Sequence, residues 1–369
     1  MHIEKLSLIN FKNYENLSLT FSEHLNCIVG KNGSGKTNIL DAIYFLSMTK
    51  SAHNPLDNQN IKFNTDYFSI KGTFVNARST DTIVCYFKEG EKKSFKKNKE
   101  DYGKLSEHIG RFPVVLITPY DSDIIRESSE IRRKFFDSII CQLDHDYMNN
   151  LVRYNKNLKQ RNSALKNFSK SGKVNKDLLE TYNSVLLDLG IKIFKKRKSF
   201  IATNLIKFNE YYKFISDERE QVSIRYGSQF DVPDVSQKLN EYSKRDIVTE
   251  RSNFGIHKDD FHFFIENNQL KKYGSQGQQK SFSIALKLMQ YHALEIGLSV
   301  KPILLLDDIF DKLDSNRINK LLTMIKSGIF NQVFITDAIK DRTENLLKDF
   351  ELNPNLYLVD NGKVEIKNE

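Results

Sequence analysis

The run Gly30-Lys31-Asn32-Gly33-Ser34-Gly35-Lys36-Thr37 constrains this chain more than any other feature of its sequence. It has the G-x-x-x-x-G-K-T pattern of a Walker A loop, whose glycines let backbone N–H groups approach a phosphate without a Cβ in the way. Lys36 would contact the β- and γ-phosphates and serve catalysis, and the Thr37 hydroxyl would be a ligand for Mg²⁺. The eight residues therefore predict a site for a nucleoside triphosphate.

The sequence around the loop predicts the context that the motif requires. Residues 25–29 form an apolar run typical of a buried strand. Apolar residues at helical spacing follow the loop: Ile39, Leu40, Ala42, Ile43 and Leu46. The predicted helix would direct the positive end of its dipole at the same anion, so a chance match to the motif is improbable.

Composition is that of a soluble globular protein, with 39% hydrophobic and 28% charged residues among 369. This length suffices for two domains, or for one large domain with an insertion. The longest strongly apolar run, residues 303–306, is far too short to cross a membrane, and no secretory signal is expected. Cys27, Cys85 and Cys141 show no CxxC spacing and indicate inert thiols, so we expect a cytoplasmic protein without a membrane partner.

The positive charge of the chain is concentrated in one segment. Residues 151–213 hold 15 Lys and Arg against 4 Asp and Glu, a net charge of +11, which leaves −2 of the total of +9 for the rest. A localised positive field is typical of proteins that bind a polyanion, although a solvated helical face is the simpler alternative. The densest part is the run Lys195-Lys196-Arg197-Lys198, which we take as the test of whether this segment binds nucleic acid.

The patterning divides the chain into three parts. Residues 1–118 predict the first part of an ATPase head, with strands on both sides of the Walker A loop. Residues 119–221 predict an inserted basic helical arm, because no proline occurs between residues 129 and 213 and apolar residues recur at helical spacing. A turn near residues 169–173 would make this arm an antiparallel hairpin. Residues 222–369 would complete the head, so that one sheet is assembled from both ends of the chain.

A second half of the nucleotide site is predicted after an apolar strand at residues 303–306. Asp307 and Asp308 follow it and read as a Walker B motif, although acid pairs are also common in turns. Asp307 would hold Mg²⁺ together with Thr37. Asp308 would orient or deprotonate the attacking water.

Ser275-Gln276-Gly277-Gln278 precede a strong helix, predicted over residues 278–296. Capping of the free N–H groups at the start of that helix is one interpretation. The other is the signature motif of ATP-binding-cassette proteins, whose helix N-terminus would meet the γ-phosphate bound by a second subunit. Phe310-Asp311-Lys312-Leu313-Asp314 then occupies the place of a D-loop.

Together these motifs make the chain similar, almost from end to end, to the RecF family of bacterial DNA repair and replication ATPases, which are related to SMC proteins. The similarity rests on the Walker A loop, the Asp307-Asp308 pair and these further motifs: Leu6 to Tyr14, Arg132 to Asp137, Tyr154-Asn155-Lys156, Gln160-Arg161-Asn162, His257 to Asp260 and Ser275 to Lys280. The chain departs from the family pattern at Tyr120, at Glu127 to Ser129, at Ile256 and at Asp311-Lys312. The last departure concerns only the D-loop.

The resemblance implies an α/β fold, an ABC-type P-loop ATPase head of mixed sheet and helices with an inserted helical arm. It implies ATP and Mg²⁺ as ligands, a homodimer when ATP is bound, and slow ATP hydrolysis. It also implies binding to DNA at single-strand gaps and junctions, and cooperation with RecR and RecO mediator proteins in recombinase loading and SOS induction. In the resulting hypothesis, Walker A of one subunit meets residues 275–278 of the other, and the basic arms close around DNA.

Two other functions share the same motifs. An ABC-type transporter ATPase subunit is the main alternative, but the basic insertion and Thr336-Asp337, in the place of the usual switch His, argue against it. A nucleotide-dependent scaffold with incidental hydrolysis is the other. Three further residues stay undecided: His257, with Asp259 and Asp260 nearby, reads as a structural residue more readily than as a metal ligand, and Arg132 and Arg133 would bind either phosphate or acids of the arm.

Overall fold

The computed structural model describes residues 1–217 and 220–367, and the backbone alone of residues 311 and 312. The chain divides into two compact units: unit 1 is Met1–Asp121, Phe214–Ser216 and Ile284–Glu369, and unit 2 is Ser122–Lys213 and Asp217–Ser283. The second unit therefore continues beyond residue 221, where we expected the arm to end. The reason is that strands after residue 221 pack on the helices of this unit.

A mainly parallel sheet in unit 1 carries the Walker motifs. Its strand order is β15-β14-β3-β13-β12-β8, and every pair is parallel except β14 with β15. The strands are β3 (Leu25–Val29), β8 (Val114–Ile117), β12 (Ile303–Leu306), β13 (Val333–Asp337), β14 (Asn355–Asp360) and β15 (Lys363–Lys367). Strand β3 from the N-terminal part lies between β14 and β13 from the C-terminal part, so the predicted assembly of one sheet from both ends is confirmed.

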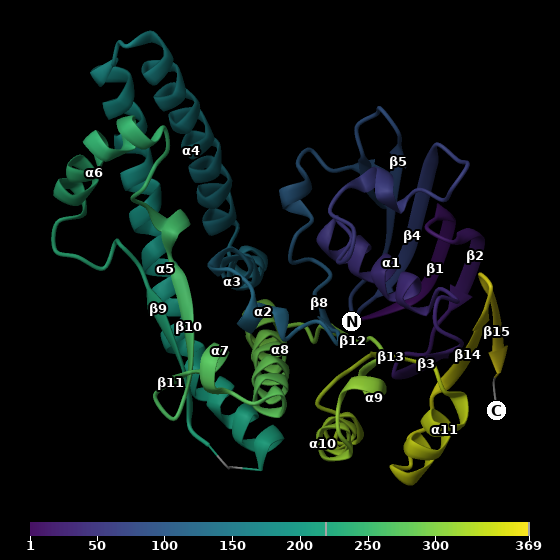
Figure 1. Ribbon diagram of the computed structural model, residues 1–369. Coiled ribbons are helices and arrows are strands. Elements are labelled where there is room, and N and C mark those ends of the chain that lie inside the picture. Colours follow the sequence, from purple (N-terminus) through teal and green to yellow (C-terminus); the bar gives the residue numbers. More distant parts are fainter. Residues whose placement is uncertain (218–219, 368–369) are drawn as a thin grey trace. The chain divides into compact units, whose positions relative to one another are not determined.

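A second, antiparallel sheet completes unit 1 with the order β2-β1-β4-β5-β6-β7. Its strands are β1 (His2–Phe11), β2 (Tyr14–Thr20), β4 (Tyr67–Val75), β5 (Thr80–Lys88), β6 (Ser94–Lys97) and β7 (Glu100–Asp101). Helix α1 (Lys36–Met48) packs between the two sheets (Figure 1). Its buried residues, among them Ile39 and Ile43, join one core with Leu6 of β1 and Phe334 of β13, which fixes the helix that begins in the Walker A loop.

Short helices connect the strands of unit 1. These are α9 (Ile309–Lys312), α10 (Ser315–Lys326) and α11 (Lys340–Asp349), with 3-10 turns η1 (Asp57–Asn60) and η2 (Leu105–Glu107).

Unit 2 contains the predicted helical hairpin, formed by α4 (His145–Ser171) and α5 (Lys176–Ser216) (Figure 1). Gly172 ends α4 at a φ of 67°, and the side chain of Asn175 accepts a hydrogen bond from the Leu178 N–H to start α5. Near this turn the two helices share a small apolar core of Ala164, Leu165, Phe168 and Leu179. Three further helices of unit 2 are α2 (Asp123–Arg126), α3 (Ser129–Leu143) and α6 (Val235–Thr249).

A three-stranded sheet, β11-β10-β9, belongs to the same unit. It consists of β9 (Val222–Gly227), β10 (Asp260–Ile265) and β11 (Asn268–Gln269). The helical segments η3 (Ile256–Lys258) and α7 (Leu270–Tyr273) belong to the same unit, as does the start of α8 (Gln276–Leu298), which passes into unit 1 at Ile284. Phe136 of α3 stacks on Phe261 of β10 with ring centroids 4.1 Å apart, which ties the sheet to the helices. Strand β11 ends at Gln269, and Leu270 opens α7.

Candidate nucleotide-binding site

The Walker A loop joins β3 to α1, in the order that its sequence predicts. Gly33 has a φ of 79° and Gly35 a φ of 115°, backbone angles that residues with a side chain rarely adopt. A Cβ on Gly35 would lie 2.4 Å from Nδ2 of Asn13, whereas a Cβ on Gly33 would meet nothing within 4 Å. The loop therefore packs against the protein at Gly35 and faces open space at Gly33.

Lys36 is 3% exposed and folds back over the loop. Its Nζ donates to the carbonyl oxygens of Gly30 (2.8 Å) and Lys31 (3.2 Å). Among the residues that the structure describes, it forms no ion pair. A buried ammonium held only by carbonyl dipoles keeps most of its charge uncompensated, so it can bind an anion that enters the loop.

Thr37 and Asp307 meet although they are 270 residues apart in sequence. The Thr37 hydroxyl donates to Oδ1 of Asp307 over 2.9 Å, and the Thr336 hydroxyl donates to the same oxygen over 2.8 Å. Thr336 Oγ1 in turn accepts the backbone N–H of Asp308 (2.9 Å), which holds Asp308 next to the pair. The structure thus brings together Thr37, Asp307 and Asp308, the residues that we assigned to metal and water.

The donor set fits a nucleotide with Mg²⁺. The Thr37 hydroxyl and the Asp307 carboxylate are the hard oxygen ligands that Mg²⁺ prefers, and they lie at the start of α1, where anions are favoured. The hydroxyl oxygen of Ser34 is buried and makes no hydrogen bond to any residue that the structure describes. A buried polar atom without a partner inside a Walker A loop is accounted for by a ligand that completes it.

The turn between β1 and β2 holds the Walker A loop in place. The Asn13 amide donates to the carbonyl oxygen of Ser34 (3.1 Å), and the Tyr14 hydroxyl donates to that of Gly35 (3.1 Å). Asn13 also accepts a hydrogen bond from the Asn38 amide over 2.7 Å. Sequence reasoning missed this role for Asn13 and Tyr14, although both lie in the opening motif that carried the family resemblance.

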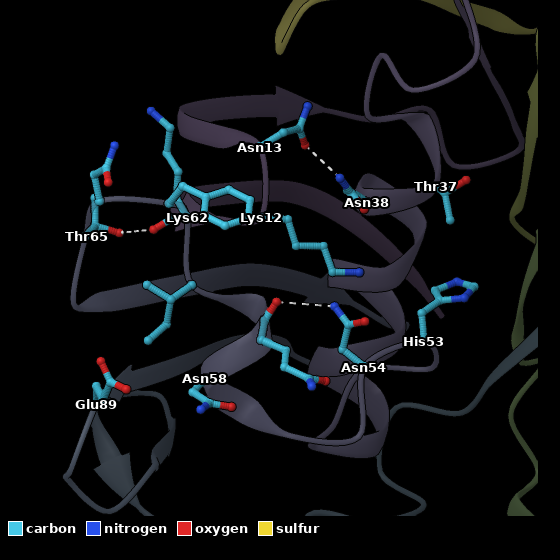
Figure 2. A pocket seen from close by; sticks show the side chains of 14 residues that line it. Lys12, Asn13, Thr37, Asn38, His53, Asn54, Asn58, Lys62, Thr65 and Glu89 are labelled. Carbon is cyan, nitrogen blue, oxygen red and sulfur yellow. Dashed lines mark hydrogen bonds between the residues drawn. The ribbon is translucent and has the colours of Figure 1, made fainter.

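A pocket of about 780 Å³ opens next to Thr37 and Asn38 (Figure 2). Amides are the most frequent polar side chains in its lining: Asn13, Asn38, Asn54, Asn58, Gln59 and Asn64. Its cations are balanced, because Lys12 pairs with Asp41 at 2.6 Å and Lys62 with Glu15 at 2.9 Å. The pocket therefore offers hydrogen-bonding groups with little net charge, beside a loop that offers a cation.

The loop at Ser275 lies in unit 2 and forms a reciprocal helix cap. The Gln278 N–H donates to Ser275 Oγ (3.2 Å), and the Ser275 N–H donates to Gln278 Oε1 (2.7 Å). Gln278 also donates to Glu220 over 2.9 Å. This geometry supports the capping interpretation, and Ser275 and Gln276 are the exposed residues of the loop at the start of α8.

The three undecided residues of unit 2 all have protein partners. Arg132 forms a two-pronged ion pair with Asp260, at 2.7 and 3.0 Å, and Arg133 donates to the carbonyl oxygen of Asp259 over 2.7 Å. His257 Nε2 lies 3.1 Å from the carbonyl oxygen of Ser252, which can only accept, so Nε2 carries the proton.

Nδ1 of His257 then accepts from the Tyr154 hydroxyl over 3.0 Å. Burial lowers the pKa of His257 to about 4, so this imidazole stays neutral. No group of three or more potential metal ligands occurs within residues 1–217 and 220–367, and the structural interpretation of His257 is favoured.

The run at residues 195–198 is not one solvent-facing cluster. Arg197 is 1% exposed and is bound by Asp137 and by Asp259, at 2.8 Å each. Lys196 pairs with Asp144 and Lys198 with Asp231. We expected these four residues to act together in binding DNA, and this was wrong for Arg197. Its side chain lies on the buried face of α5, four residues after Ile193 and four before Ile201.

Two remaining predictions concern the D-loop and the membrane. The side chains of Asp311 and Lys312, which mark the altered D-loop, lie outside the described part of the chain. Across the described residues, no helix combines the length and the apolar character needed to cross a membrane.

Known proteins resemble this chain over nearly its whole length. The family model described as RecF/RecN/SMC N terminal domain matches residues 2–361. A "DNA replication and repair protein RecF" of Cytophaga hutchinsonii is 45% identical over 365 residues, which covers 99% of this chain and 97% of that protein. Its counterpart in Flavobacterium johnsoniae is 46% identical over 348 residues, which covers 94% of this chain and 97% of that protein.

Solved structures agree in fold. The structure of the recombination mediator protein RecF-ATP in the RecFOR pathway superposes with a TM-score of 0.90 at 29% identity, covering 100% of this chain and 98% of that one. An Smc head domain with an extended coiled coil from Pyrococcus furiosus gives a TM-score of 0.54 at 17% identity, covering 99% and 96%, and supports the fold alone. The predicted fold, an ABC-type ATPase head with a helical arm, is confirmed.

Proposed function

This chain belongs to the RecF family of DNA replication and repair proteins, and we propose that it acts as an ATP-gated DNA clamp. Two chains would bind two ATP molecules, close around DNA at a gap or junction, and open again after slow hydrolysis. Such a clamp would act in the cytoplasm with RecR- and RecO-type mediators, and would support recombinase loading and SOS induction.

The observation that carries the nucleotide part is the contact between Thr37 and Asp307. It places a Walker A hydroxyl and a Walker B carboxylate side by side, where together they would hold Mg²⁺. The β- and γ-phosphates would lie over residues 30–37, with Lys36 as their cation and with Ser34 Oγ finding the partner that it lacks. The pocket beside Asn38 is within the size range of ligand sites and would take the nucleoside end.

Asp308 is proposed as the residue that orients or deprotonates the attacking water. It lies beside the Thr37–Asp307 pair through its bond to Thr336. Mg²⁺ would supply charge neutralisation for the phosphates when bound. An aspartate reaches less far than a glutamate, which is consistent with slow turnover.

Completion of the site by a second chain is the finer part of the proposal. Ser275-Gln276-Gly277-Gln278 start a long helix, and a helix N-terminus with exposed backbone is suited to a γ-phosphate. ATP would then add affinity only in the closed dimer and shift the population towards it.

Mixing two inactive variants tests this arrangement. Lys36→Met removes the Walker A cation, and Ser275→Arg blocks the loop at residues 275–278. Each variant alone should hydrolyse no ATP, whereas a mixture should recover part of the activity, because a mixed dimer contains one intact site. Gln269→Arg, at an exposed position of β11 outside this loop, adds the same side chain and serves as a matched control that should stay active. A mixture as inactive as its components would contradict a site shared between chains.

The transporter alternative is not favoured. In place of a switch His, Asp337 is fully buried and bound by Arg342 and Thr343, so it faces the protein. The RecF relatives described above cover nearly the whole chain, including its basic segment.

A further inference from the structure

The two helices of the hairpin differ in how they present their positive charge. No Asp or Glu occurs from Tyr147 to Lys176, so α4 beyond its first turn is free of acids. All four acids of residues 151–213 lie on α5, where Asp188 pairs with Lys192 and Glu210 with Lys207. The excess charge of the arm is therefore carried by α4 more than by the α5 run at residues 195–198.

Four lysines of α4 form what we call the basic stripe: Lys156, Lys159, Lys166 and Lys170. All four are exposed, and within the described residues none of them has an ion-pair partner. At 3.6 residues per turn they fall within about 80° of the helix circumference. The buried residues Tyr154, Leu165 and Phe168 lie on the opposite side, so packing of the hairpin leaves the basic stripe uncovered within unit 2.

We propose that the basic stripe is a docking surface for the phosphate backbone of duplex DNA; this inference rests on the proposed DNA-binding function. From Lys156 to Lys170 the helix rises by about 21 Å. One DNA strand places a phosphate every ~3.4 Å along the duplex axis, so the stripe matches about six base pairs. A helix with four cations along one side complements such a rod of charge.

The chemistry of this face selects duplex over single strand. Proteins that bind single strands present aromatic rings on which bases stack. Every aromatic residue of α4 is buried: Tyr147 is 3% exposed, Tyr154 1% and Phe168 8%. Between the lysines the face offers only small or amide side chains, such as Ser163 and Asn167. It can therefore contact phosphates without reading bases.

The test compares two variants that lose the same charge. The stripe variant carries Lys→Gln at the four positions of the basic stripe. The control carries Lys192→Gln, Lys196→Gln, Lys198→Gln and Lys207→Gln, because each of these α5 lysines is already paired with an acid. Both are assayed with ATP for binding to a 30-base-pair duplex and to oligo(dT), over a series of salt concentrations, and without DNA for ATP binding.

The stripe variant should reduce the magnitude of the negative slope of log K against log salt for the duplex by about 3 to 4, since each lost phosphate contact removes ~0.9. The control should change the slope by less than about 1, and ATP binding without DNA should be unchanged in both. An unchanged duplex slope in the stripe variant, an equal loss in both variants, or a loss confined to oligo(dT) would overturn the inference while leaving the clamp intact. Failure of the unaltered chain to bind any DNA would overturn the clamp and the stripe together.

Discussion

Two buried cations, one in each unit, have opposite environments. Lys36 in unit 1 is held by two carbonyl oxygens and has no ion-pair partner among the described residues. Arg197 in unit 2 is enclosed by the carboxylates of Asp137 and Asp259 and by the Ile256 carbonyl. A buried charge without a counter-charge is costly, so it indicates a place where a ligand supplies one, whereas a fully paired charge is part of the fold.

The largest effect is expected for Arg197→Met. Removing the guanidinium leaves two carboxylates without their counter-charge, which should lower the free energy of unfolding by about 3–5 kcal/mol in denaturant titrations. Lys198→Met is the control, because its pair with Asp231 is exposed on both sides and is worth at most ~1 kcal/mol. Equal losses for the two variants would remove the distinction between a paired buried cation and its exposed neighbour.

The pH dependence of that loss provides a further check. Burial raises the pKa of Asp259, and loss of Arg197 would raise it further. A carboxyl whose pKa is higher in the folded state destabilises the fold as the pH rises. The destabilisation by Arg197→Met should therefore be larger at pH 8 than at pH 5.

Lys36→Met should weaken ATP binding and leave stability almost unchanged, whereas Arg197→Met should lower stability. ATP affinity should fall about a hundredfold, because charge-assisted hydrogen bonds to two phosphates are lost. The free energy of unfolding should change by less than about 1 kcal/mol, since the loss of two bonds to carbonyl oxygens is offset by the removal of a buried charge that has no counter-charge. Calorimetric titration and thermal unfolding measure the two quantities, and Lys50→Met, beyond the end of α1, is the exposed control. A stability loss as large as that of Arg197→Met would make Lys36 a structural residue.

Two glycines of the Walker A loop separate backbone strain from packing. Gly33→Ala should cost about 1 kcal/mol for a positive φ alone, because its Cβ has open space. Gly35→Ala should cost about 2–3 kcal/mol, because its Cβ would also collide with Asn13 and Tyr14. Equal losses in denaturant titrations would mean that the β1–β2 turn does not hold the loop.

The smallest effect concerns two histidines, the buried His108 of unit 1 and the half-buried His257 of unit 2. Burial lowers the pKa of His257 and of His108 to about 4, below the value of 6.5 for an exposed imidazole. Between pH 6.5 and 4 the unfolded chain binds more protons, so stability falls as the pH falls. His257→Gln should abolish about 1–2 kcal/mol of the loss in stability between pH 7 and pH 5. A variant whose pH profile matches that of the unaltered chain would contradict the neutral state of His257.

Local signals in the sequence were enough to predict the elements around the Walker A loop. The apolar strand before residue 30 and the helical spacing after residue 37 predicted β3 and α1, and two acids after an apolar run predicted the partner of Thr37. Strand β3 and helix α1 adjoin the Walker A loop, and the two acids directly follow a buried strand, so the pattern of apolar and polar residues is enough to predict them.

Contacts between distant segments that carry no motif were not accessible from the sequence. Arg197 looked like one of four basic residues in a run, and only its i±4 relation to Ile193 and Ile201 marked it as buried. Its partners come from α3 and from the residue before β10, at separations of about 60 residues, which no local pattern encodes. Helices α6, α10 and α11 were not predicted either, although α10 is amphipathic, with Ile318, Leu321 and Leu322 buried.

The most direct test of the account is the mass of the chain in solution, measured by light scattering with ATP and Mg²⁺, with ADP, and without nucleotide. If Lys36 holds ATP in a site completed by a second chain, the mass should rise from 43.0 kDa to twice that value with ATP alone, and Lys36→Met should stay at 43.0 kDa. A mass that is the same under all three conditions, or a dimer that forms equally well in Lys36→Met, would contradict the account.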